Sequence, residues 1–379
     1  MDRFENEALY ELLRMAVDEG NSPCCLSHRL DSNEWEKLHS ECLRQFITGV
    51  VYRGVCRLPR DQQPPIELAF QWASEVETIK GQNKLLNAEA ARLTELFAAQ
   101  GRKTAVLKGP ANALLYPDSY MRQVGDIDLW VDGGRDSVCT LLKKMGYQIS
   151  ETDFDVFHHF HLYPTNNDIS VEVHFRPSFG TWNPFTKKCI LCFLEEEIQK
   201  VERVDEGFYV PSIKFALAMQ LTHIMHHFIG EGVGAKQIVD YYILLKHSSE
   251  DDRREITAKL SSFGLLKICG ALMWILGNVF GLDKSKMLCE PDEKHGKEML
   301  AVIHEGGNFG YYAQNLLNES SMNMAVRCLK HRWRNIRKFW FAPMDVFCCE
   351  LDYWGSFIKS IPLRIKLRKF SLWDVYHAK

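Results

Sequence analysis

Two aspartates one residue apart stand in the apolar segment 125–131, GDIDLWV. The alternation is typical of a β-strand, so Asp126 and Asp128 point to one face while Ile127 and Leu129 point to the other. Adjacent carboxylates repel each other and gain nothing from burial unless a cation lies between them. Their hard oxygens favour Mg²⁺, or Mn²⁺, which takes further ligands from water and substrate phosphates. The pattern predicts a divalent-metal site; the alternative is a solvated strand end.

A third acid lies in a second segment of strand character, SVEVH at 170–174. Ser170, Glu172 and His174 share one face, and Val171 and Val173 share the other. This pattern makes Glu172 a candidate third metal ligand, with His174 placed to contact a phosphate or to orient Glu172. The alternative is a half-exposed strand whose polar residues face water and form no site.

A glycine turn upstream could hold a phosphate. Gly109 follows the short apolar strand 104–107 and opens a helix, so backbone N–H groups there can meet an anion with help from the helix dipole. Pro110 suits the first helical position, although it removes one amide. Lys108 could add a cationic phosphate contact, or could simply be a solvated strand-end lysine.

Arg122 lies four residues before the first aspartate, in a polar loop. Its guanidinium could bind a triphosphate oxygen pair in bidentate fashion, or it could form an ion pair with Asp126 or Asp118. Beside a metal-bound triphosphate, the first role is the one we predict.

The order Lys-Gly, short helix, Tyr-Pro, Arg and Gly-Asp-Ile-Asp-Leu-Trp-Val resembles the nucleotidyltransferases of the DNA polymerase β superfamily, and more narrowly a bacterial group labelled uncharacterised nucleotidyltransferases. The resemblance covers roughly residues 107–176. It implies a phosphate-binding turn at Gly109 and metal ligands Asp126, Asp128 and Glu172. The superfamily usually has Gly-Ser at the turn, whereas this chain has Gly109-Pro110.

The resemblance also implies a reaction. A nucleoside monophosphate would move from a nucleoside triphosphate to an acceptor hydroxyl, with release of pyrophosphate and with two metal ions clamping the attacking and leaving oxygens. The sequence indicates neither the nucleobase nor the acceptor, which could be a small molecule, a protein or RNA. A competing interpretation is a catalytically inactive module that binds a nucleotide or a partner on the same fold.

Histidines form two further groups, His158-His159-Phe160-His161 on a strand and His223, His226 and His227 on a helix. His223 and His227 share a helix face. No Glu follows the first of them, so the zinc-protease pattern fails. A histidine-based phosphohydrolase is a third interpretation, but we expect packed or surface imidazoles that could line a cleft.

The bulk composition is that of an ordinary globular protein. The 379 residues are 46% hydrophobic and 25% charged, with a net charge of −3 that excludes an overall attraction to nucleic acid. Two basic segments, 327–338 and 361–370, could bind RNA, DNA or an anionic membrane surface, or could be solvated helix faces.

Nothing in the sequence indicates export. The acidic, amphipathic start is unlike a signal peptide, and the 12 cysteines show no zinc spacing, so we expect reduced thiols in a cytoplasmic protein. The most apolar run, 264–282, contains Lys267 and Asn278 and predicts a buried helix, not a transmembrane segment.

The elements around these residues predict an α/β (α+β) nucleotidyltransferase core with a mixed sheet, flanked by helical N-terminal and C-terminal regions. The expected divisions are 1–82, 83–211 and 212–379. A long helix is expected at 66–100. Strands are expected at 104–107, 126–131, 147–150, 156–163 and 168–175, and an edge hairpin at 202–210. Further helices are expected at 135–145, 213–229, 235–247, 250–263, 265–280 and 322–341.

Overall fold

A mixed four-stranded sheet carries the paired aspartates. The computed structural model describes residues 3–17, 24–149, 157–163, 169–230, 232–307, 332–333, 335 and 338–366. The strands lie in the order β1 (Thr104–Val106), β2 (Ile127–Val131), β4 (Val171–His174) and β3 (His159–His161). The central pair β2–β4 is parallel, and both outer pairs are antiparallel. The predicted mixed sheet is therefore confirmed.

Two details of the predicted strands differ. Asp126 lies just before β2 and not within it. The strand expected at 147–150 is reduced to a single bridge between Gln148 and Tyr163. The expected hairpin is present as a separate two-stranded sheet of β5 (Val201–Arg203) and β6 (Tyr209–Pro211).

The register sorts the side chains of the sheet into two faces. Asp128 is paired with Glu172, and Trp130 with His174, across β2 and β4. The alternate positions, Val171 and Val173 among them, enter a hydrophobic cluster with α4 (Ile66–Ala98) and α6 (Gly134–Lys144). The predicted separation of Glu172 from the valines is thus confirmed, and the carboxylates occupy the face opposite the valines.

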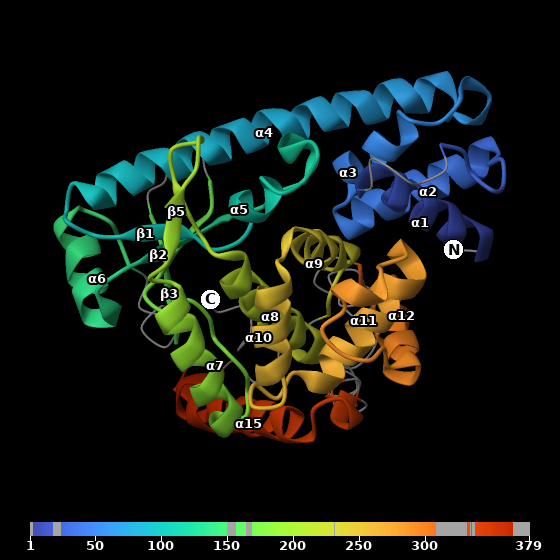
Figure 1. Ribbon diagram of the computed structural model, residues 1–379. Coiled ribbons are helices and arrows are strands. Elements are labelled where there is room, and N and C mark those ends of the chain that lie inside the picture. Colours follow the sequence, from blue (N-terminus) through green and yellow to red (C-terminus); the bar gives the residue numbers. More distant parts are fainter. Residues whose placement is uncertain are drawn as a thin grey trace.

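The longest element, α4, has 33 residues and runs along one side of the molecule, from the N-terminal helices to the sheet (Figure 1). Its second half is rich in Leu, Ala and Glu, which favour helices. It ends shortly before Gly101, which has a positive φ of 71° suited to a helix terminus. The expected boundary between residues 82 and 83 therefore falls inside one continuous helix.

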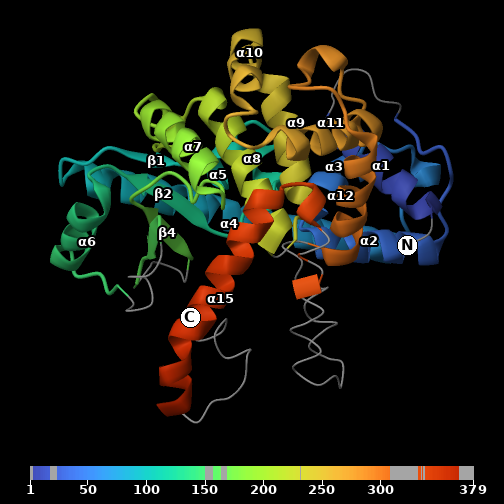
Figure 2. The same cartoon turned by 90° about the horizontal axis from the view of Figure 1, so that it is seen from below.

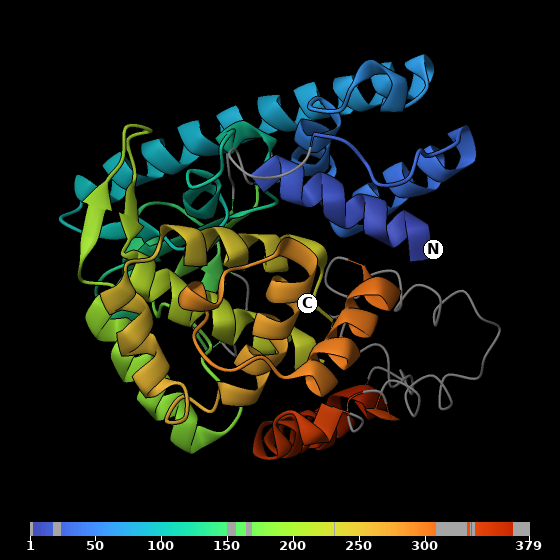
Figure 3. The same cartoon turned by 45° about the vertical axis from the view of Figure 1, so that its right-hand side comes forward.

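Helices from both ends of the chain share a second hydrophobic cluster. The N-terminal group comprises α1 (Arg3–Val17), α2 (Ser32–Gln45) and α3 (Thr48–Val55). The C-terminal group comprises α8 (Ile213–Gly230), α9 (Ala235–His247), α10 (Glu250–Lys259), α11 (Leu266–Phe280) and α12 (Glu293–Gly306). Figure 3 shows the blue N-terminal helices beside the orange ones, and α1 packs against α11. The predicted buried helix in the most apolar run is α11.

Three long helices were not among those expected from the sequence, and α12 is one of them. α7 (Pro184–Glu197) begins where the Asn183 side chain accepts a hydrogen bond from the Phe185 N–H, and Pro184 occupies its first turn. α15 (Pro343–Lys366) extends away from the rest of the molecule (Figure 2). The helix predicted at 322–341 and the basic segment 327–338 lie mostly outside the described residues, whereas the second basic segment, 361–370, continues α15 as far as residue 366.

Over the described part of the chain, no helix combines the length and the apolar character needed to cross a bilayer. The cysteines within those same ranges are all free thiols.

Candidate active site

The pairing of β2 with β4 places Asp128 beside Glu172. Potential ligand atoms of Asp128, Glu172 and His174 lie within 4.8 Å of one another. Asp128 is fully buried, and its Oδ2 has no hydrogen-bond partner among the described residues. A buried carboxylate oxygen without a partner is costly, and a divalent cation would satisfy it. The donor set therefore fits the metal ion implied by the sequence.

Two cationic side chains contact these carboxylates. Lys108 Nζ lies 3.1 Å from Asp128 Oδ1. His174 Nε2 lies 3.0 Å from the same oxygen and 3.4 Å from Glu172 Oε2. The structure thus brings the predicted residues Lys108 and His174 into direct contact with the predicted metal ligands.

These contacts decide which groups are charged. Burial acts to raise the pKa of Asp128, but Lys108 and the hydrogen bond from His174 outweigh it and lower that pKa. Burial acts in the same way on Glu172, and His174 and His159 lower its pKa well below the ordinary value. Burial acts to lower the pKa of His174, but its bonds to the two carboxylates raise it to about 9. Without a metal ion, His174 is therefore the proton-carrying bridge between two carboxylates.

Asp126 behaves differently from its neighbour. Its pKa is raised, first by repulsion from Asp128 and then by burial, with Lys108 opposing both. The single positive charge of Lys108 therefore does not neutralise the negative charges of both aspartates. A bound cation would neutralise the remaining negative charge. Asp126 shares this electrostatic field, although it is not among the residues whose ligand atoms lie within 4.8 Å of one another.

Gly109 makes the turn that precedes α5 (Pro110–Ala113). Its φ of 60° and ψ of −109° form a conformation open mainly to glycine. A Cβ there would lie 3.0 Å from the Asp126 carbonyl oxygen and 3.3 Å from Val124 Cγ1. The glycine is thus required for the close approach of the turn to the aspartate loop. Phosphate binding at this turn stays a prediction.

Gly109→Ala is expected to lower the free energy of unfolding by roughly 1–3 kcal/mol, because the new methyl group meets backbone in a strained conformation. Urea unfolding measures this loss. The matched control is Gly81→Ala in α4, where a Cβ meets nothing within 4 Å and helix propensity predicts a small gain. Equal stability of Gly109→Ala and the wild type would show that the turn tolerates a side chain.

Arg122 pairs with neither Asp126 nor Asp118, the two ion-pair alternatives considered from the sequence. Its partner is Asp240 in α9, with Nε 2.7 Å from Oδ1 and Nη2 2.6 Å from Oδ2. The Tyr116 hydroxyl also donates to Asp240, at 2.7 Å. Sequence reasoning could not supply this partner because it lies 118 residues away.

The bidentate ion pair changes what Arg122 can offer a nucleotide. Both members are buried, and only Nη1 has no hydrogen-bond partner within the described part of the chain. A direct phosphate contact of Arg122 stays a prediction, and Nη1 is the atom that could make it with the pair intact. Asn83 in α4 holds the same loop by donating to the Tyr120 and Arg122 carbonyls, at 2.7 and 2.8 Å.

Lys236 is a cation in the electrostatic field of Asp126 that was not predicted from the sequence. It lies in the first turn of α9, directly after a loop with glycines at 232 and 234. Burial and the charge of Arg122 lower its pKa to about 8, while Asp240 and Asp126 oppose them. A glycine-containing loop before a helix with lysine in its first turn is a recognisable signal for an anion site.

The histidine-rich strand borders the carboxylates. His159 Nδ1 lies 3.6 Å from Glu172 Oε2, and His161 Nε2 lies 3.7 Å from Glu172 Oε1. These two imidazoles therefore lie against the carboxylate of Glu172, and a role for them in the chemistry stays a prediction. His223 and His227 stack edge to face at 4.3 Å, but neither belongs to a metal-capable group of the described residues. The positions of His223 and His227 therefore do not support the interpretation of the protein as a histidine-based phosphohydrolase.

A cavity of about 580 Å³ opens beyond the other end of β2, and its walls include Asp132, Arg135 and Arg176. None of the predicted site residues lines it. The partnerless oxygen and the shifted pKa values are found at the carboxylates and not at this cavity.

Comparison with known proteins identifies a family for the chain. No curated protein matches the chain. A family model described as "uncharacterised nucleotidyltransferase" matches residues 31–281, about two thirds of the sequence, and the matched part contains both aspartates, Glu172 and Lys236. The chain therefore belongs to this uncharacterised nucleotidyltransferase family.

Proposed function

We propose that the protein is a metal-dependent nucleotidyltransferase that moves a nucleoside monophosphate from a nucleoside triphosphate to an acceptor hydroxyl and releases pyrophosphate. The observation that carries the proposal is the register of β2 and β4, which brings Asp128 and Glu172 together beside a carboxylate oxygen that lacks a partner. Asp126, Asp128 and Glu172 would hold Mg²⁺, or Mn²⁺, through hard oxygen ligands. The bound ion would neutralise the triphosphate and activate the acceptor hydroxyl.

The protein's own residues prepare the site for an anionic substrate. Lys108 is kept charged, since Asp128, Asp126 and Glu172 outweigh the effect of burial on its pKa. With a metal ion bound to the carboxylates, Lys108 would be free to donate from its ammonium group to a phosphate oxygen. Lys236 brings a second cation into the field of Asp126. Gly109 gives the phosphates access to backbone next to the metal site.

The test is thermal stabilisation by each nucleoside triphosphate, with and without Mg²⁺, in the wild type and in Asp126→Asn/Asp128→Asn. A metal-dependent shift that the double variant abolishes supports the proposal. A shift of the same size without metal and in the double variant would instead identify a nucleotide-binding module without catalysis. Transfer itself is read from a nucleotide labelled at the α-phosphate and incubated with cell extract, which also reveals whether the acceptor is a small molecule, a protein or RNA.

The pH dependence of nucleotide binding tests Lys236. Its pKa of about 8 means that the free protein loses this positive charge as the pH rises through that value. Binding that needs the charge must then take up a proton, so affinity should be level below about pH 7 and should weaken towards about pH 9. Titration calorimetry with a nonhydrolysable triphosphate and Mg²⁺ measures this.

Lys236→Arg is the matched control, because arginine keeps its charge across the same range. Its affinity should vary less with pH than that of the wild type. If both proteins weaken equally, another group causes the pH dependence and Lys236 does not contact the nucleotide.

A further inference from the structure

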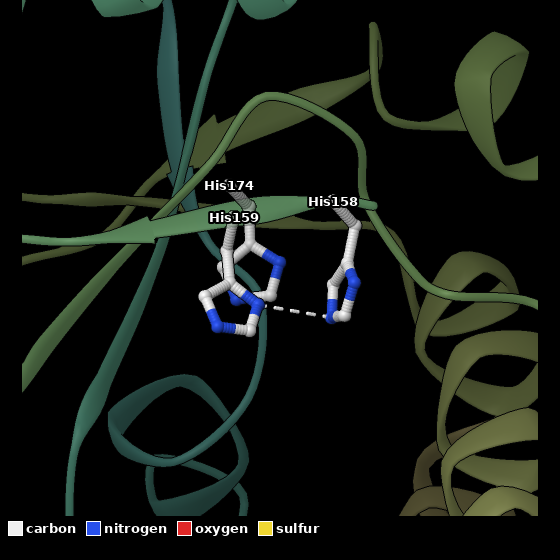
Figure 4. A group of neighbouring side chains, drawn as sticks. All are labelled: His158, His159 and His174. Atoms are coloured by element: carbon white, nitrogen blue, oxygen red, sulfur yellow. Dashed lines mark hydrogen bonds between the residues drawn. The ribbon is translucent and has the colours of Figure 1, made fainter. Parts of the chain in front are cut away.

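Three imidazoles gather beside the carboxylates. His159 lies in β3, His158 precedes it, and His174 lies opposite His159 in β4. Figure 4 shows the three rings extending into the same space, and one ring nitrogen from each lies within 4.8 Å of the others. His158 Nε2 is 3.1 Å from His159 Nδ1. The nitrogen atoms of these rings can therefore direct several lone pairs into one small volume, as a metal site requires.

We propose that His158, His159 and His174 bind a first-row transition-metal ion of the Zn²⁺ type, at a site that adjoins the oxygen ligands of the proposed Mg²⁺ centre. Imidazole nitrogen suits Zn²⁺ and its neighbours in the series far better than it suits Mg²⁺. In a tetrahedral site with Zn–N bonds of about 2.0–2.1 Å, two ligand atoms lie about 3.4 Å apart. The His158–His159 contact of 3.1 Å is close to that separation.

The unpaired nitrogen of His174 is an independent observation. Only 4% of this residue is exposed, and its Nδ1 has no hydrogen-bond partner among the residues described. Figure 4 draws one His174 nitrogen on the side facing His158. The other, Nε2, contacts Asp128 Oδ1 at 3.0 Å. A histidine that binds a metal ion commonly gives its second ring nitrogen to a carboxylate, and His174 has that arrangement.

Glu172 would connect the two sites. Its Oε2 lies 3.6 Å from His159 Nδ1 and 3.4 Å from His174 Nε2. Three histidines leave the fourth tetrahedral position to a further ligand, and the Glu172 carboxylate is near enough to supply it. A hard ion held by oxygens and a borderline ion held by nitrogens would then share one carboxylate. This inference does not require the protein to be a nucleotidyltransferase.

The test uses the full-length protein, stripped of metal with a chelator and titrated with Zn²⁺ by calorimetry. One tight site is expected, and Co²⁺ bound there should show the visible absorption of a tetrahedral complex. His158→Ala and His159→Ala should each weaken Zn²⁺ binding by roughly 100-fold or more, since each removes one of three ligands. His247→Ala, which removes an exposed imidazole at the end of α9, is the control and should bind as the wild type does.

Unchanged Zn²⁺ affinity in both histidine variants would overturn the proposal. So would Zn²⁺ binding that Asp126→Asn removes and the histidine variants keep, because the ion would then belong to the carboxylates. Circular dichroism of the metal-free variants checks folding, and His158→Gln or His159→Gln replaces the alanine variant at the same position if that variant fails to fold. Failure of the nucleotide and Mg²⁺ test with Zn²⁺ binding intact would reject the proposed transferase activity and leave this site standing.

Discussion

Asp128→Asn is expected to lower metal-dependent nucleotide transfer by roughly 10³-fold or more, because a lost metal contact in the transition state is worth several kcal/mol and each 1.4 kcal/mol is tenfold in rate. Asp126→Asn should cause a comparable loss. The measurement is incorporation of label from an α-labelled triphosphate into the acceptor fraction of an extract, at saturating Mg²⁺.

The two variants should differ in stability when no metal is present. The Asp126 carboxylate is destabilised by repulsion from Asp128 and by burial, so Asp126→Asn should raise the melting temperature of the metal-free protein at neutral pH. Asp128 accepts contacts from Lys108 and His174, so its amide variant leaves both cations poorly paired and should melt lower. Opposite shifts in stability with the same loss of transfer would separate a functional effect from misfolding. Full transfer by either variant would exclude the carboxylates from the reaction.

Removing one member of the buried pair between Arg122 and Asp240 should have the largest effect on folding. Arg122→Met leaves the Asp240 carboxylate buried without its cationic partner, although the Tyr116 hydroxyl still donates to it, and the free energy of unfolding should fall by roughly 3–5 kcal/mol. Asp240→Leu should cost a similar amount. Urea unfolding followed by tryptophan fluorescence measures both losses.

The double variant Arg122→Met/Asp240→Leu is the matched control. It removes both charges together, so it should recover much of the stability that either single change loses. Tyr116→Phe removes only one hydrogen bond and should cost about 1 kcal/mol. Losses that simply add in the double variant would mean that the two side chains are not coupled.

The alternation of polar and apolar residues along two short strands was enough to predict much of the candidate site. Asp128 separated from Ile127 and Leu129, and Glu172 from Val171 and Val173, because successive side chains point to opposite faces. The structure confirms that separation for Asp128 and Glu172. What the pattern did not contain was the parallel register that sets one carboxylate beside the other. Register depends on contacts between segments more than 40 residues apart.

Other features of the candidate site could not be predicted because they depend on contacts between residues far apart in the sequence. Arg122 was identified as a charged side chain of interest, but its partner comes from α9. Lys236 was missed because its neighbours in the site, Asp126 and Arg122, are far away in the sequence. α7 had a local signal, Asn183 followed by Pro184 at the first helical position. That element could have been found by reading helix caps instead of apolar spacing alone.

Because α4 is one continuous helix, it limits how far the protein can be truncated without loss of its fold. Asn83, which fixes the loop before the aspartates, lies midway along the helix, and the preceding turns bury Trp72 against the N-terminal helices. A chain truncated to begin at residue 83 would lose the first half of α4. The second half of the helix would then lack the N-terminal helices against which α4 packs. The family model starts at residue 31, one position before α2, and stops at 281, one position after α11. The inherited unit therefore contains the helices on both sides of the sheet, and engineering of the site should keep them together.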